Sequence, residues 1–142
     1  MLKKTITWTD YDGNERTDDY YFYISKPELI EWQASEVGGL DKKIERISRE
    51  QDVKKVIELM KEMIQLSYGV KSDDGKRFIK NQEVLDEFMQ TEAYSELFME
   101  LATDADAAAD FINGILPAGL AEEVKKIEAA NAKKLEAVES SK

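Results

Sequence analysis

Histidine and cysteine are both absent from this chain of 142 residues. Without cysteine, no disulfide, thiolate nucleophile or zinc–thiolate site is possible. Without histidine, the chain lacks the commonest general base and the commonest ligand of transition metals. Together the two absences exclude Ser-His and Cys-His catalysis and histidine-ligated zinc or iron. We therefore expect a protein that is not an enzyme and holds no cofactor or metal.

Long apolar runs and an excess of positive charge are missing as well. No stretch reaches the ~18 apolar residues of a membrane span, and the N-terminus MLKKTITWTD has no signal-peptide core. The 20 Lys and Arg residues face 30 Asp and Glu residues, a net charge of −10. Nucleic acids and anionic membranes are bound through cations, so neither is an expected partner. The lack of a span and of a signal-peptide core indicates a cytosolic soluble protein, and the acidic surface favours solubility and basic partners.

The pattern of residues predicts an α+β chain, mainly α, with an N-terminal β-hairpin followed by a bundle of four to six helices. Residues 1–24 are rich in β-branched and aromatic side chains around the turn sequence Asp12-Gly13-Asn14. Tyr20 and Phe22 alternate with Tyr21 and Tyr23, which puts aromatic rings on both faces of the second strand. An isolated hairpin is marginally stable, so this one must pack on helices or pair with another sheet edge.

Capping residues divide residues 25–117 into helices. Ser25 and Glu28 form a capping box with Pro27 in the first turn, and Gly38-Gly39 ends that helix. The helical period of residues 40–68 breaks at Asp52, a possible second cap, and Gly69 is the expected stop, followed by a loop over 71–77. Further N-caps are Asn81, Asp104 and Thr91, although Thr91 also fits inside one longer helix. The last helix is expected to turn inward Ala105, Ala108, Ala109, Ile112 and Ile115.

Residues 1–117 are long enough for one globular domain, with the hairpin over 1–24 and the helices over 25–117. Residues 118–142 form a different, Ala/Glu/Lys-rich tail that we expect to be partly helical or disordered. Five Lys and five acidic residues leave this tail neutral, so residues 1–117 carry the whole net charge. Asn131 and paired lysines interrupt the tail's apolar stripe of Leu120, Val124, Ile127, Leu135 and Val138.

Two acidic clusters are more typical of structure than of metal binding. Residues 10–14 resemble a calcium loop, but the glycine is fourth and the twelfth position is Tyr21, so a hairpin turn fits better. Asp104, Asp106 and Asp110 have a spacing that can hold Mg²⁺ in nucleases. An N-cap and an acidic first turn account for them more simply.

Three sets of residues are candidates for binding other proteins. The basic cluster of residues 76–80 offers Lys76, Arg77 and Phe78 to an acidic partner, or to another copy of this acidic chain. The apolar residues Tyr94, Phe98 and Met99 lie in a helix where adjacent Phe98 and Met99 cannot both point into one core. A first strand at the edge of a sheet offers self-association through Thr5, Thr7 and Thr9.

The segments KKTITWTDYDGNERTDDYYFYISKPEL and RFIKNQEVLDEFMQTEAYSELFMELATDADAAADFINGILP resemble the tail assembly chaperones of long-tailed bacteriophages (siphophages). The resemblance covers most of residues 1–117 and contains no catalytic signature. It implies a non-enzymatic protein that binds the phage tape measure protein, keeps it soluble and helps recruit tail tube subunits in the cytoplasm of the infected bacterial host. A homo-oligomer is compatible with it, and the tail would suit a linker to a frameshifted C-terminal extension.

Two other functions remain open on the residues alone. The first is a small phage-encoded regulator or inhibitor that docks on a host protein. The second, a Mg²⁺-dependent enzyme using Asp104, Asp106 and Asp110, is the weaker of the two.

Overall fold

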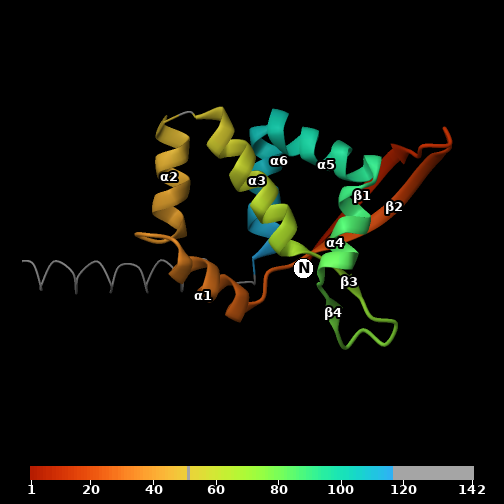
Figure 1. The fold of residues 1–142 in the computed structure, drawn as a ribbon, viewed down its shortest axis with the longest axis horizontal. Coiled ribbons are helices and arrows are strands. Elements are labelled where there is room, and N and C mark those ends of the chain that lie inside the picture. The colour runs from red at the N-terminus through yellow and green to blue at the C-terminus, as the bar shows by residue number, and fades with distance from the viewer. Residues whose placement is uncertain (51, 117–142) are drawn as a thin grey trace, which may run out of the picture.

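The computed structural model describes residues 1–50 and 52–116 (Figure 1). Within these residues the chain forms four strands in one sheet of order β1-β2-β3-β4, and six helices. The strands are β1 (Leu2–Thr9), β2 (Glu15–Phe22), β3 (Tyr68–Lys71) and β4 (Phe78–Ile79). The helices are α1 (Lys26–Ser35), α2 (Leu40–Glu50), α3 (Val53–Ser67), α4 (Gln82–Met89), α5 (Glu92–Thr103) and α6 (Ala105–Ile115). The predicted α+β, mainly α fold is confirmed, whereas the tail over 118–142 lies outside the described residues.

The predicted N-terminal hairpin is confirmed. β1 and β2 pair antiparallel from Leu2 opposite Phe22 to Thr9 opposite Glu15. In the turn, one carboxylate oxygen of Asp10 accepts the backbone N–H groups of Asp12 and Asn14, at 3.0 and 2.9 Å. The other oxygen accepts Arg16 Nε at 2.6 Å, and this bond, ahead of the backbone N–H groups, holds the pKa of Asp10 below its usual value. Both carboxylate oxygens of Asp10 therefore stabilise the turn by hydrogen bonds.

A second, smaller hairpin replaces the predicted helix stop and loop. Gly69 does not end α3, which ends at Ser67; it lies in β3, beside Tyr21 of β2. β3 then pairs with β4, which leaves residues 72–77 as the connecting loop. The sequence conceals these strands because four and two residues are too short to show a strand's alternation. Glycine at position 69 leaves room for the ring of Phe78, since a Cβ there would lie 2.6 Å from that ring unless the ring shifts.

The predicted helix starts are confirmed by their hydrogen bonds. Ser25 and Glu28 form a complete capping box, with Pro27 in the first turn of α1. The side chain of Asp52 accepts the backbone N–H groups of Lys54 and Lys55, so α2 and α3 are separate helices. Asn81 and Asp104 cap α4 and α6. Thr91 caps α5, which decides between the two interpretations of that residue.

The inner face of α6 agrees with the prediction only in part. Ile115 is buried as expected, and Ala108 and Ile112 are half-buried. Ala105 and Ala109 are exposed instead, and Phe111 is the second buried residue of the helix. The core side of α6 is centred on Phe111 and Ile115 because the ring of Phe111 fills more space against the sheet than alanine methyl groups do.

Aromatic rings join the sheet to the helices in the core. The ring of Phe22, which is fully buried, lies 5.6 Å from Tyr68, 6.0 Å from Phe88 and 5.3 Å from Phe111. These four residues come from β2, β3, α4 and α6, so the end of β2 is the point where the elements meet. Tyr68 and Phe88 stack at 4.3 Å. The hairpin thus packs on helices, as its marginal stability alone requires.

Candidate interaction surfaces

The β3–β4 loop presents Lys76 and Arg77 to solvent. The carboxylate of Asp74 accepts the N–H of Lys76 at 3.0 Å, and Ser72 Oγ accepts the N–H of Arg77 at 3.0 Å. Gly75 adopts a φ of +72°, which favours glycine, and closes the turn. Both basic side chains are exposed, and neither has an ion pair within the described part of the chain. Hydrogen bonds therefore fix the backbone of the loop, and the charged side chains of Lys76 and Arg77 extend from it into solvent.

Aromatic rings and a further lysine lie on the sheet face next to this loop, which we call the outer face. Phe78 is half-buried, with its ring over Gly69 and edge-on to Tyr23 at 6.4 Å. Lys71, opposite Phe78 in the ladder, places its ammonium 4.0 Å from the centre of the Tyr21 ring. The outer face thus combines aromatic surface with the positive charge of Lys71, and the loop that carries Lys76 and Arg77 adjoins it at Phe78.

Lys80, the last member of the predicted basic cluster, has a structural role. Its Nζ donates to the carbonyl oxygens of Tyr23 and Leu66 and to both carboxylate oxygens of Glu28. Burial opposes ionisation of Glu28, but Lys80 and the capping bonds with Ser25 outweigh it and lower the pKa of Glu28. Lys80 therefore joins the ends of β2 and α3 to the first turn of α1.

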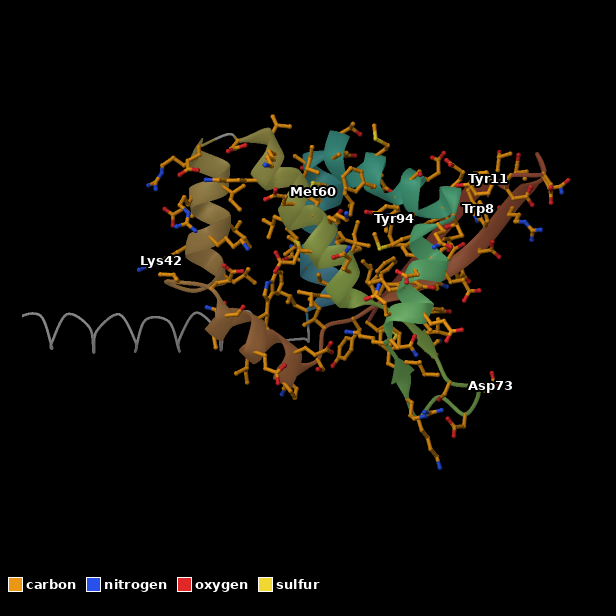
Figure 2. All side chains as sticks on the ribbon, viewed as in Figure 1. Trp8, Tyr11, Lys42, Met60, Asp73 and Tyr94 are labelled. Carbon is orange, nitrogen blue, oxygen red and sulfur yellow. The ribbon has the colours of Figure 1, made fainter. Side chains whose placement is uncertain are left out.

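The three candidates on α5 differ in exposure. Tyr94 is half-buried against Phe88, with ring centres 5.8 Å apart, and Phe98 packs beside Tyr94 at 5.9 Å. Met99 points outward and exposes 57% of its surface. Figure 2 places Tyr94 well away from Asp73 in the β3–β4 loop. The structure therefore does not bring the α5 residues and the basic loop together in one site.

Thr5, Thr7 and Thr9 lie on the edge strand, as the sequence predicts. Asp10 N–H donates to the Asn14 carbonyl at 2.9 Å, which makes these residues a hydrogen-bonded pair of the ladder. Bonded and non-bonded pairs alternate in antiparallel sheets, so the backbone N–H and C=O groups of the three threonines point away from β2. Among the described residues none of these groups has a backbone partner. β1 thus has an open edge.

The aspartates at the start of α6 serve as cap and first turn. The carboxylate of Asp104 accepts the N–H groups of Asp106 and Ala107 at 3.0 and 3.2 Å. Asp106 and Asp110 are exposed, and within the described residues no three acidic groups are placed to hold a metal ion. The cap interpretation of Asp104 is confirmed.

Sequence reasoning misses three contributors to the outer face, namely Tyr21, Tyr23 and Lys71. The alternation of Tyr21 and Tyr23 with Tyr20 and Phe22 signals that β2 has two aromatic faces. Nothing in the sequence signals which face the helices leave open, because that depends on where β3 and β4 join the sheet. The sequence places Lys71 in a loop, and only its register opposite Phe78 puts it on this face.

The geometry defines a class of protein: a small α+β module in which a four-stranded sheet with one open strand edge packs on helices. None of the helices in residues 1–50 and 52–116 is long and apolar enough to cross a membrane. The sequence profile of a family described as phage tail assembly chaperone matches residues 1–142, the whole chain. The chain belongs to this family. No curated protein and no solved structure matches it.

Proposed function

We propose that the protein is a non-enzymatic chaperone that binds the tape measure protein of a phage, keeps it soluble and helps recruit tail tube subunits. The family match over residues 1–142 carries this proposal. The site of action would be the cytoplasm of the infected bacterial host, where tails are assembled. The outer face supports a role in binding, because half-buried aromatic rings beside a loop with free cations suit a partner with apolar and acidic side chains.

The binding surface we assign to the tape measure protein is the outer face with its loop, centred on Phe78, Lys76 and Arg77. Lys71 extends the positive charge across the sheet. Met99 on α5 would give a second, separate contact, while Tyr94 and Phe98 would act by holding α5 in place. For self-association we assign the open edge of β1 at Thr5, Thr7 and Thr9, which can add a strand from a second copy.

Co-expression tests the function directly. The chain is produced together with the long coiled-coil product of the neighbouring tail gene, and the soluble fraction of that product is measured. We expect the soluble fraction to rise and the two proteins to co-purify. An unchanged soluble fraction and no co-purification would refute the proposal. If a pull-down from host lysate instead returns one stoichiometric bacterial partner, the protein is a regulator of a host protein.

A charge-reversal pair tests the surface. Lys76→Glu/Arg77→Glu should weaken co-purification, because it replaces the free cations of the loop with negative charge. The matched control is Lys42→Glu/Arg49→Glu, which changes the net charge equally at exposed positions on α2. Equal effects of the two double variants would show that only total charge matters and would remove the outer face from the proposal.

A further inference from the structure

Helix α2 lies at the edge of the molecule and is attached to the rest of it by few apolar side chains. Figure 1 shows it beside α3, its main neighbour, and on the side away from the sheet. Leu40 and Ile47 of α2 are buried, and Ile44, which shares their face of the helix, is half-buried. Ordering a chain costs conformational entropy at every residue, so three apolar side chains are little to hold a helix of 11 residues in place.

The packing between α2 and α3 is incomplete. A hollow of about 360 Å³ lies between the two helices. Lys43 and Ile47 line it from α2, and Lys55, Leu59 and Glu62 line it from α3. Side chains that border an open space lose the dispersion contacts that a close-packed neighbour would give them. The hollow therefore lowers the stability of the contact between α2 and α3.

The two ends of α2 are built so that it can move without its neighbours. Gly38 and Gly39, directly before α2, have φ angles of +81° and +90°. Glycine has access to more backbone conformations than any other residue, so this connection can change direction at low cost. At the other end, Asp52 caps α3 by accepting the backbone N–H groups of Lys54 and Lys55. The start of α3 therefore does not depend on a continuous helix from α2.

Lys43 joins α2 to both neighbouring helices. Its Nζ donates to Glu36 Oε1, just after α1, at 2.7 Å and to Glu62 Oε2 of α3 at 3.3 Å. The other carboxylate oxygen of Glu62 accepts Trp32 Nε1 of α1 at 2.7 Å. The Lys43 and Glu62 side chains expose 20% and 35% of their surface, so water weakens their ion pair. One lysine thus holds α2 closed through bonds that solvent reaches.

Opening of α2 would uncover apolar surface next to side chains that are already exposed. Leu59 is buried beside the hollow between α2 and α3. Val56 lies one turn before Leu59 on α3 and exposes 36% of its surface. Val53 and Ile57, in the same first turns of α3, expose 71% and 41%. The position of α2 therefore decides how far the apolar surface at the start of α3 extends.

We propose that α2 is a strap that opens away from α3 while the rest of the fold stays intact, that Lys43 holds it closed, and that opening extends the exposed apolar surface of α3 to Leu59. The strap controls how much apolar surface the start of α3 presents to other proteins. It is a feature of the free chain, and it does not depend on the chaperone role or on the surface assigned to the tape measure protein.

Amide hydrogen exchange followed by mass spectrometry tests the opening in the natural chain, without any substitution. Relative to an unstructured chain, peptides from α2 should exchange about tenfold or more faster than peptides from α5, where Leu97 is fully buried. Urea well below the unfolding midpoint should leave the exchange of α2 nearly unchanged and speed that of α5, because only global unfolding exposes α5. Equal protection of both helices with the same dependence on urea would overturn the proposal, since α2 would then open only when the whole chain unfolds.

Thiol labelling tests Lys43 and the uncovered surface, because the natural chain has no cysteine and a single one reports cleanly. Leu59→Cys is combined with Lys43→Met or with the matched control Lys42→Met, which removes an exposed lysine of α2 that has no ion pair within the described residues. The thiol should react with a soluble disulfide reagent about threefold or more faster in the Lys43→Met variant than in the control.

Two outcomes of the labelling would contradict the proposal. Equal rates in the two double variants would show that Lys43 does not hold α2 closed. If Lys43→Met instead speeds hydrogen exchange in α5 as much as in α2, the lysine stabilises the whole fold, and α2 is not a strap that opens by itself.

Discussion

A variant without the ammonium group of Lys80 tests whether the hydrogen bonds of this lysine join the sheet to the helices. Lys80→Met keeps the aliphatic stem and deletes the donor to the carbonyl oxygens of Tyr23 and Leu66 and to the carboxylate of Glu28. Each fully buried acceptor that loses its partner costs about 1–3 kcal/mol. The Lys80 and Glu28 side chains expose 21% and 38% of their surface, so water replaces part of what is lost.

With that discount we expect the free energy of unfolding to fall by about 2–3 kcal/mol, most of it from the two carbonyl groups. For a chain of this size the loss corresponds to a melting temperature roughly 5–10 °C lower. Urea unfolding at about pH 7 gives the value, provided that the slope with denaturant is unchanged. Lys76→Met is the matched control, because this exposed lysine has no ion pair within the described residues and should change stability by less than about 0.5 kcal/mol.

The pH dependence separates the carboxylate from the carbonyl groups. The pKa of Glu28 is lower in the folded chain than in the unfolded one, so the ion pair stabilises the fold above the unfolded pKa. This contribution disappears as the pH falls through the folded pKa. The difference between the natural chain and Lys80→Met should therefore shrink from about pH 7 to about pH 3, without vanishing. Equal stability of the Lys80→Met and Lys76→Met variants, or a difference independent of pH, would refute the reasoning.

Three further predictions concern the sheet and its core. Gly69→Ala should lower the free energy of unfolding in urea by about 1–3 kcal/mol, because the new methyl group meets the Phe78 ring. Adding Phe78→Leu to this variant should recover part of the lost stability. Thr7→Pro should lower the oligomer mass in light scattering and leave the helical circular dichroism intact, because the Thr7 N–H faces the open edge. The control Ile6→Pro should disrupt the hairpin. An unchanged mass of the Thr7→Pro variant would exclude the edge as the assembly surface. Burial, followed by the charges of Tyr20 and Glu87, raises the pKa of Tyr68 to about 12. Its phenolate absorbance should therefore appear late in an alkaline titration, and the free energy of unfolding should fall as the pH rises from about 10 to about 12. Appearance of the Tyr68 signal near pH 10 would contradict this buried environment.

Much of the fold follows from local chemistry that a sequence displays. The five capping residues hydrogen-bond the first turns of their helices, and the Asp10–Asn14 turn forms as its residues predict. These features depend on neighbours within a few positions, so the order of residues is sufficient to find them. The β-hairpin is visible for the same reason, since β1 alternates in sequence and β-branched and aromatic residues lie on both sides of a turn sequence.

The second hairpin is hidden because it depends on residues far apart in sequence. β3 forms where the chain leaving α3 meets Tyr21 and Phe22 of β2, and only that meeting explains a glycine beneath Phe78. The candidate binding residues show the same limit. Lys76 and Lys80 look equivalent in the sequence, yet one is exposed on a loop and the other holds three elements together. Tertiary contacts, which the sequence does not display, decide which lysine remains available.

The distribution of ion pairs argues that the attraction for partners is local rather than global. With a net charge of −10, the chain as a whole repels acidic proteins. Lys4, Arg16, Lys43, Lys55 and Lys80 are engaged in ion pairs, which removes them as attractors. Lys71, Lys76 and Arg77 form no ion pair within the described residues; Lys71 lies over the Tyr21 ring, and the other two precede Phe78 in the adjoining loop. Asp73 and Asp74 of the same loop offset part of this charge, and the other acidic groups of the chain are screened, because a Debye length is about 8 Å at physiological salt. Partner binding at this face should therefore weaken when salt is added, and faster for the natural chain than for Lys76→Glu/Arg77→Glu.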